Sequence, residues 1–414
     1  MNLLTPSTTL QYLTFAALAL PGLLSSAHAG RVEENYQSDF QYGHYSESNQ
    51  RINVDIFEGS LGLPIGKAMT ASVNLVRDSI SGASPVYNKK DAQGNAHQVI
   101  SGASATSSCG ASICEQRDAI NGNLSYFFDT AALNIGGGFS REQDYTSRFF
   151  STNLSLDVNK KMTTLNYGAS VAFDTIEPSP SPWNSRPIGF NRSKTSQQYL
   201  LGITQLIDKN SLLQGNISFA YSEGFMSDPY KVVAFYDPNE PLLFNGNLYA
   251  NAIKPDQRPE EKFQWAALLQ YVRHIDYTND GALHIDYRFA SDDWSIQSHT
   301  FEVSWHQPIA NQWLIIPRLR YYSQTEADFY QVTGTQLEST FFSSDYRLAS
   351  FGALSGGIKL SKEISHLKAL KQLKFQTGIE YYDHNADYQL TGNNSNHFTD
   401  FSYYLVTASF NVRF

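Results

Sequence analysis

Long apolar runs are nearly absent from this sequence of 414 residues. Residues 12–24 form a run of the length found in the apolar region of signal peptides, and Ala27-His28-Ala29 follows as a small-x-small cleavage site. Residues 1–11 depart from the usual signal because they contain no Lys or Arg. No other stretch approaches the roughly 20 apolar residues of a membrane-spanning helix. We therefore expect residues 1–29 to be a cleaved signal peptide and residues 30–414 to form one domain without such a helix.

Cysteine is also scarce, since only Cys109 and Cys114 are present. In an exported chain two cysteines so close together favour a local disulfide, and reactive or metal-binding thiols are the alternative. No histidine or acidic cluster beside the cysteines completes a zinc site. The sequence therefore predicts a Cys109–Cys114 disulfide and no metal.

Basic stripes and catalytic motifs are missing as well. The 30 Lys and Arg are scattered among 39 Asp and Glu, for a net charge of −9, which argues against a nucleic-acid-binding protein. No nucleophile-elbow motif, metalloprotease helix motif or phosphate-binding loop is present. We therefore expect no enzyme, no catalytic residues and no cofactor. An outer-membrane enzyme remains the third possibility for function, because Ser304 is a candidate nucleophile beside His306 by adjacency in the chain alone.

What the sequence does contain is alternation of apolar and polar residues with a period of two, the pattern of β-strands with two different faces. The last segment shows it best. One face carries Tyr404, Val406, Ala408, Phe410, Val412 and Phe414. The opposite face carries Thr407, Ser409, Asn411 and Arg413. Because apolar and polar residues average out, the mean hydropathy is only −0.35, and the 14% of aromatic residues suits the girdles of a membrane barrel.

The alternating segments are longer than the five or six residues typical of soluble strands, which favours strands that cross a membrane. Sixteen of them are predicted, at residues 31–46, 51–63, 68–79, 117–128, 131–142, 146–159, 162–175, 193–207, 211–224, 259–273, 281–291, 295–308, 312–327, 346–362, 371–388 and 399–414. Each long connection follows an odd-numbered strand: 80–116, 176–192, 225–258 and 328–345. Short periplasmic turns and long extracellular loops are typical of outer-membrane barrels. The predicted fold is thus an all-β, transmembrane, antiparallel up-and-down barrel. Pro317, inside a strand, suggests a bulge or a misplaced boundary.

If the apolar face meets lipid, the polar face lines the lumen. Strands eleven to thirteen then place seven ionisable side chains inside together: His284, Asp286, Arg288, Glu302, His306, Arg318 and Arg320. We expect Arg51, Asp55, Asp157, Asp174, Lys359, Lys374 and Glu380 to point inward too. Mixed charges on a barrel wall can select solutes by their field. The alternative is structural, with the charges satisfying one another and water.

The first outer loop contains Ser81-Gly82-Ala83-Ser84-Pro85 and a near-copy at Ser101-Gly102-Ala103-Ser104. Small residues with a proline favour a tight, close-packed turn. A structural role is the first interpretation, and a ligand contact inside the barrel mouth is the alternative if the loop folds inward.

This block also carries a family resemblance. Arg77-Asp78 leading into Ser81–Pro85, after strands that open with Arg31-Val32 and Arg51-Ile52, resembles the bacterial family catalogued as domain of unknown function 3570. The resemblance implies an exported outer-membrane barrel of a Gram-negative bacterium. Genes beside those of the family often encode a small lipoprotein, a flavin transferase and thioredoxin-like proteins, which implies a role in envelope redox or metal handling. The family supplies no catalytic residues.

From these features we expect a porin-like channel or transport component of the bacterial outer membrane, acting on a small solute. The alternative is a non-conducting structural or interaction barrel serving an envelope redox or metal-handling system. Expected partners are outer-membrane lipid and, through the C-terminal strand ending in Phe414, the barrel-assembly machinery. No nucleic acid is expected as a partner.

Overall fold

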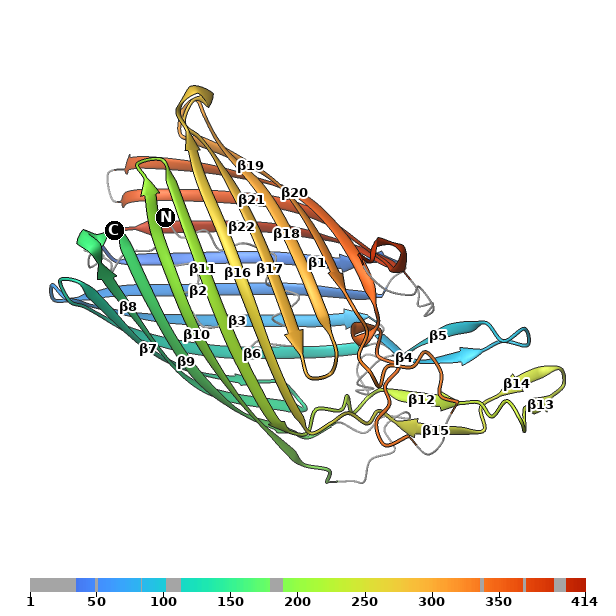
Figure 1. The fold of residues 1–414 in the computed structure, drawn as a ribbon. Helices are drawn as coiled ribbons and strands as arrows, with labels where there is room; N and C mark the ends of the chain where they lie inside the picture. The colour runs from blue at the N-terminus through green and yellow to red at the C-terminus, as the bar shows by residue number, and fades with distance from the viewer. Residues whose placement is uncertain are drawn as a thin grey trace.

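Sixteen antiparallel strands close into one barrel in this computed structural model (Figure 1). The structure describes residues 35–48, 51–82, 84–101, 113–178, 189–335, 339–367, 370–390 and 400–414. No helix within those ranges is long and apolar enough to cross a membrane. The barrel strands are β1 (Gln37–Glu47), β2 (Ile52–Ile65), β3 (Met69–Gly82), β6 (Ile113–Phe127), β7 (Ala131–Arg141), β8 (Tyr145–Val158), β9 (Thr163–Ile176), β10 (Arg192–Asp208), β11 (Ser211–Gly224), β16 (Glu261–Ile275), β17 (Gly281–Asp292), β18 (Gln297–Ile309), β19 (Trp313–Gln324), β20 (Phe351–Leu367), β21 (Leu370–Asn385) and β22 (Phe401–Arg413).

The predicted barrel of sixteen strands is therefore confirmed, and every predicted strand overlaps an observed one. Each strand pairs with its neighbour along the chain, and β22 pairs with both β21 and β1, which closes the cylinder. The boundaries of β20, predicted at 346–362, lie five residues further along the chain. The structure instead forms a short 3-10 helix, η5 (Tyr346–Leu348), at this point, because the side chain of Asp345 accepts a hydrogen bond from the backbone N–H of Arg347.

The two ends of the barrel differ in the length of their connections. At the turn end, where the C-terminus lies, short turns join the strands, two of them with the 3-10 helices η3 (Asn159–Lys161) and η4 (Asp276–Thr278) (Figure 1). At the loop end lie the four predicted long connections and a fifth, residues 386–400, which begins with η6 (Ala386–Tyr388). The asymmetry of connection lengths is thus the one expected of an outer-membrane barrel.

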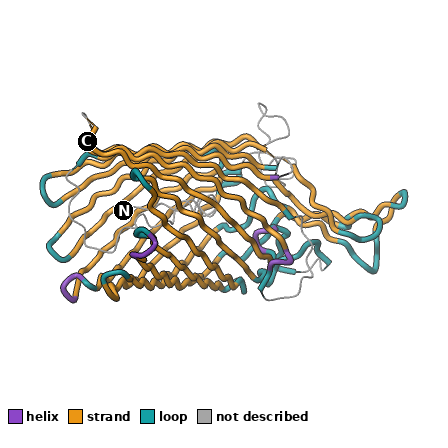
Figure 2. Tube along the Cα trace, turned by 90° about the horizontal axis from the view of Figure 1, so that it is seen from above, coloured by secondary structure: helices purple, strands orange, loops and turns teal. Residues whose placement is uncertain are grey.

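The loops at this end carry three short hairpins of their own, and these project beyond the barrel strands (Figures 1 and 2). The hairpins are β4 (Ser84–Lys90) with β5 (Ala96–Ser101), β12 (Val232–Phe235) with β15 (Ala252–Pro255), and β13 (Leu242–Phe244) with β14 (Asn247–Tyr249). The first hairpin corrects the prediction of a tight turn at Ser81–Pro85. Ser81 and Gly82 end β3, Ser84 and Pro85 begin β4, and the chain reverses at residues 91–95 instead. Ala83 lies outside the described residues.

Apolar side chains cover the outer wall of the barrel. In β22 the side chains of Tyr404 and Val406 are 55% and 41% exposed, whereas those of Tyr403 and Leu405, which alternate with them, are 8% and 5% exposed. Because successive side chains point to opposite faces of a strand, the exposed set faces outward and the buried set inward. The same alternation recurs around the barrel. So large an exposed apolar surface is not found on soluble monomers, and it fits contact with lipid.

Pro317 does not introduce the predicted bulge. Residues on both sides of it keep one register between β18 and β19, with Ser304 opposite Arg318 and Gln307 opposite Ile315. The pairs between these two are missing from the ladder. Because proline has no backbone N–H, it interrupts the hydrogen bonds locally, and the alternation of the strand is preserved.

Asp55 was expected to point inward, and this prediction is wrong. Val54, its neighbour on β2, is buried inside, so Asp55 faces outward. Its carboxylate Oδ1 lies 2.8 Å from Nδ1 of His44 on the adjacent strand β1. The contact with His44 on the same outer face partly satisfies the Asp55 carboxylate there.

A charge placed on the outer wall should destabilise the barrel if that wall meets hydrocarbon. Leu319 is 62% exposed near the middle of β19. We expect Leu319→Arg to lower the free energy of unfolding in lipid vesicles by about 2–4 kcal/mol, measured by urea titration with heat-modifiability on gels. The control is Tyr277→Arg, because Tyr277 is 89% exposed in a turn at the turn end. Equal effects of both changes would contradict the placement of the outer wall in lipid.

Candidate functional site

The seven predicted inner-wall residues lie on the three neighbouring strands β17, β18 and β19. They alternate with Ile285, Phe301 and Leu319, which are exposed on the outer wall. The seven side chains therefore point to the inner face, as predicted from the alternation. Four of them, Asp286, Glu302, Arg318 and Arg320, lie close together. Asp286 is opposite Glu302, and Glu302 is opposite Arg320. Arg318 is opposite Ser304, the next inward residue of β18 after Glu302.

Arg318 is at the centre of the described contacts of this inner wall. Its guanidinium lies 3.5 Å from Glu302 on β18 and 3.2 Å from Glu380 on β21, so it bridges two carboxylates. To reach Glu380 it must cross β20, where Gly357 is opposite both Arg318 and Glu380. A Cβ at Gly357 would lie 2.8 Å from the backbone oxygen of Ile379. Glycine at position 357 therefore leaves room for the Arg318 side chain to reach across β20 to Glu380.

His284 and His306 stack on each other beside this bridge, with ring centroids 4.1 Å apart. Nε2 of His306 lies 3.3 Å from Oγ of Ser304, so alternate residues of β18 do reach each other although their backbones are far apart. A nucleophile needs a base that a third group orients. In the described residues the His306 ring contacts Ser304 and His284, and neither is a carboxylate. Among the described residues, no carboxylate orienting His306 accompanies these two contacts.

The inner wall on the opposite side of β20 is aromatic and apolar. Tyr45, Val54, Phe401, Tyr403 and Leu405 form a buried cluster near the loop end. A buried ion pair borders it, in which Nε of Arg51 lies 3.0 Å from Glu47, and the Arg51 guanidinium packs over the ring of Phe401. An apolar and aromatic patch thus lies near the loop end on β22, β1 and β2, close to the charged inner wall of β17 to β19.

Three loops pack together at the loop end and form a unit that we call the loop cluster: residues 84–101, 225–260 and 325–350, apart from 336–338. The amide of Asn88 donates to the carbonyl oxygen of Val332 at 3.0 Å, which joins the first loop to the third. Backbone hydrogen bonds link Tyr236 and Ala234 to Gly334, joining the second to the third. The Tyr230 hydroxyl donates to Asp144 and so ties the cluster to the rim of the barrel. These contacts hold the loops to one another rather than leaving each one free.

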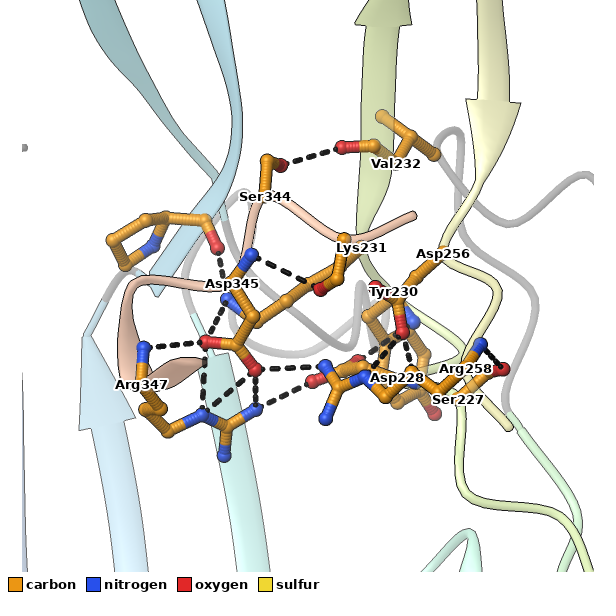
Figure 3. Close-up of polar contacts among 12 residues, drawn as sticks. Ser227, Asp228, Tyr230, Lys231, Val232, Asp256, Arg258, Ser344, Asp345 and Arg347 are labelled. Carbon is orange, nitrogen blue, oxygen red and sulfur yellow. Dashed lines mark hydrogen bonds and ion pairs between the residues drawn. The ribbon is translucent and has the colours of Figure 1, made fainter. Parts of the chain in front are cut away.

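A group of six charges, mostly buried but with Arg347 partly exposed, holds the loop cluster together (Figure 3). Asp345 is 0% exposed, and three cations surround its carboxylate. Arg347 donates to it at 2.9 Å and Arg258 at 2.9 Å, while Nζ of Lys231 lies 3.6 Å away. Lys231 also donates to the carbonyl oxygen of Pro85 at 2.8 Å. The second and third loops therefore meet at this carboxylate, and Lys231 links the first loop to it through Pro85.

Two further acids balance the cations. Asp256 pairs with Arg258 at 2.7 Å, and Asp228 pairs with Arg347 at 2.8 Å, so the group carries three charges of each sign. Burial alone would raise the pKa of the Asp345 carboxyl, but the positive charges of Arg347, Lys231 and Arg258 hold it well below its usual range. Asp345 is therefore ionised. Removing its charge would leave the cations buried with too few partners.

A second polar group lies at the loop end of β6 to β8. Glu115, Glu142 and Asp144 bring one carboxylate oxygen each within 4.8 Å of the others. Burial raises the pKa of Glu142, which follows β7, to about 7; Arg117 opposes this shift, and Asp144 and Asp78 add to it. His274, Asp276 and Asp280 form a similar group in a turn at the turn end. Close carboxylates alone do not identify a metal site, so neither group is assigned one.

A cavity of about 540 Å³ opens on the flank of the loop cluster. Trp294 and Phe329 line it with apolar surface, and Asp293, Asp328 and Gln331 add polar groups. Its size lies within the range of ligand pockets. It is an open depression beside the loops, apart from the inner wall.

Sequence reasoning did not find the charges of the loop cluster. They lie in two long loops separated by about a hundred residues, and nothing in their local pattern brings them together. The one available signal was four charged residues, Lys231, Asp256, Arg258 and Asp345, in loops otherwise rich in turn-forming residues. The predicted disulfide stays a prediction, because Cys109 lies outside the described residues, as does the predicted signal peptide.

Comparison with known proteins agrees with the resemblance noted from the sequence. The profile of the family described as "Protein of unknown function (DUF3570)" matches residues 10–405. No curated protein matches the chain. Among solved structures the chain is similar to the siderophore receptor PirA from Pseudomonas aeruginosa, with 7% identity, a TM-score of 0.41, and 86% of this chain and 57% of that one covered.

Two further structures have similarly low sequence identity and TM-scores. CdiB from Acinetobacter baumannii has 9% identity and a TM-score of 0.47, with 90% of this chain and 60% of that one covered. OccK5 (OpdH) from Pseudomonas aeruginosa has 7% identity and a TM-score of 0.41, with 92% and 98% covered. The chain thus spans less than two thirds of the length of the first two. Scores below 0.5 carry no argument about function.

Neutralising Asp345 should loosen the loop cluster without unfolding the barrel. We expect Asp345→Asn to destabilise the cluster by about 3–5 kcal/mol, because the buried Lys231 and Arg258 and the partly exposed Arg347 lose their common partner. Limited proteolysis of the folded protein in detergent should then cut within residues 225–260 much faster than in the wild type. Asp91→Asn is the control, since Asp91 is in the turn of the β4–β5 hairpin and makes only local contacts with Gln93, Asn95 and His97. Unchanged cleavage in Asp345→Asn would contradict the role of the charge group.

The raised pKa of Glu142 predicts a dependence of stability on pH. Folding favours the protonated carboxyl, so this contribution to stability is present below the usual pKa of 4.5 and is lost as pH rises through about 7. We expect Glu142→Gln to stabilise the barrel at pH 8 by about 1–2 kcal/mol, allowing for partial solvent screening, and to leave it unchanged at pH 4. Urea titrations at the two pH values measure the difference. An effect that is the same at both pH values would show that Glu142 does not titrate in this range.

Proposed function

The chain belongs to the family DUF3570, described as proteins of unknown function, and we propose that it acts in the bacterial outer membrane as a channel or transport component for a small solute. One observation carries the proposal: the inner wall of a closed barrel bears a compact belt of charge on β17 to β21. Arg318 links Glu302 and Glu380 within it. Polar lining and ion pairs such as Lys194–Asp174 are expected of a structural barrel too, but a cation held between two carboxylates from separate strands also places a local field at the wall.

The apolar patch next to the belt gives it a chemical role. Arginine and carboxylate side chains on β18, β19 and β21 lie beside the apolar and aromatic cluster of Tyr45, Tyr403 and Leu405 near the loop end. A solute passing such a wall meets a field across its path together with apolar surface, and both contribute to selection. With the turn end in the periplasm, the loop cluster lies outside the cell, where it controls how solutes approach the belt.

A second function is favoured by a different observation. The β13–β14 hairpin exposes Leu242, Leu243 and Phe244 at the loop end, away from the outer wall. Exposed apolar clusters of this kind often mark protein contacts. The alternative is therefore a non-conducting interaction barrel, which serves an envelope redox or metal-handling system as the family resemblance implies. We propose that neither function involves catalysis.

Charge removal from the belt tests the channel directly. In planar bilayers with a salt gradient, we expect Arg318→Gln with Arg320→Gln to shift the reversal potential toward cation selectivity, by several-fold in permeability ratio, because Glu302 and Glu380 remain without their cation. Arg273→Gln is the control, since Arg273 pairs with Asp208 at the turn end of the outer wall. An unchanged reversal potential would contradict the role of the belt. Absence of conductance from the wild type and also from Asp345→Asn would favour the interaction barrel.

A further inference from the structure

The outward-facing Lys and Arg of the described barrel strands fall into two groups. One group, Arg273, Lys362 and Lys371, lies near the turn end. The other consists of Arg77 on β3, Arg141 on β7 and Arg148 on β8, toward the loop end, and all three side chains are exposed. Only the second group is gathered on neighbouring strands of the sheet, β3, β6, β7 and β8.

The arginines mark a boundary on the outer wall. Two rows of outward-facing residues run side by side across β3, β6, β7, β8 and β9. The row toward the turn end is Leu75, Ile120, Phe139, Arg148 and Phe173. The row toward the loop end is Arg77, Asp118, Arg141, Thr146 and Thr175. Between these rows the outer wall changes from apolar to polar on β3, β6, β7 and β9, as it does where hydrocarbon ends and headgroups begin, whereas on β8 the row toward the turn end already holds Arg148.

The backbone positions of the three arginines are near one another on the outer wall. Arg77 and Arg141 are both opposite Asp118, and adjacent strands are about 4.8 Å apart, so about 10 Å separates their Cα atoms. Arg148 is diagonal to Arg141 across β7 and β8, at about 7 Å. Asp118 is the acid between them, with Oδ1 2.6 Å from Nε of Arg77. The group therefore keeps two positive charges in excess.

Arg148 shows most clearly that an anion is needed. It lies in the apolar row, directly opposite Phe139 on one side and Phe173 on the other. Its guanidinium lies 5.9 Å from the ring centroid of Phe139. A cation among side chains that contact acyl chains is costly unless it extends to the interface and finds a negative partner there.

From this arrangement we propose that Arg77, Arg141 and Arg148 bind the phosphate of an outer-leaflet phosphorylated glycolipid, whose acyl chains pack on Phe139, Phe150 and Phe173. Guanidinium groups bind phosphate through two parallel hydrogen bonds each. A phosphomonoester carries nearly two negative charges near neutral pH, which matches the excess of two on the protein, whereas a phosphodiester carries one. The site is on the outside of the barrel, so it is independent of solute passage.

The test compares lipids that differ only in the phosphate. The full-length folded protein is reconstituted in zwitterionic nanodiscs that contain a phosphomonoester glycolipid or the same glycolipid after dephosphorylation. We expect the phosphorylated form to raise the temperature at which the barrel unfolds on gels, and phosphorus analysis to find it retained through detergent washing. In the variant Arg77→Gln/Arg141→Gln/Arg148→Gln, retention should fall about tenfold. Arg273→Gln, which removes an outward cation at the turn end, should retain lipid as the wild type does.

A second variant keeps the proposal testable if the triple variant does not fold. Asp118→Asn removes the one acid of the group, so it should retain more phosphorylated glycolipid than the wild type. Equal retention of the two glycolipids by the wild type, or no gain in Asp118→Asn, would overturn the proposal. Stabilisation of the same size by inorganic phosphate alone would also overturn it, because the site would then be a free anion site without a preference for lipid.

Discussion

Everything in this molecule depends on the pairing of β1 with β22, because that pairing leaves no strand of the sheet with a free edge. In a bilayer an unpaired backbone N–H or C=O has no water to bind, so an open sheet of this length could not cross it. Once the cylinder is closed, period-two alternation has only one arrangement available. One set of side chains must face outward and the other inward, and the residue after each outward Tyr, Phe or Leu becomes lumen wall.

The inward-facing side chains differ in character from one part of the lumen wall to another. On β17 to β19 the inward set is charged, and on β22, β1 and β2 it is aromatic or aliphatic near the loop end. Charges on the wall are compensated across strands rather than along them, as in the bridge from Glu302 through Arg318 to Glu380. Such a bridge fixes three strands to one another from the inside. The same principle operates in the loop cluster, where one carboxylate, that of Asp345, collects cations from two loops.

The sequence alone predicted the strand number, the order of pairing and the face of each charge on β17 to β19, because these follow from local alternation. Asp55 was misplaced since a single polar residue beside an apolar one does not define the parity of a strand, and its partner His44 lies on another strand. Pro317 was expected to disturb the register, although a missing N–H interrupts a ladder without shifting it. The contacts of Lys231, Arg258 and Asp345 were beyond reach, because they join residues from separate loops and no periodic pattern records them.

Alternation also couples the outer and inner walls at the loop end. Arg77 and Asp78 are adjacent in the chain, so the cation faces outward and the acid faces inward, and Arg141 and Glu142 repeat the arrangement on β7. The result is a separation of charge across the wall, with an excess of arginine outside and of carboxylates inside. Burial of the inner acids raises the pKa of Glu142, so their repulsion is relieved by a proton or by Arg117. Anionic headgroups outside would relieve the repulsion among the arginines in the same way. The level at which hydrocarbon gives way to headgroups therefore determines the chemistry of both faces of these strands.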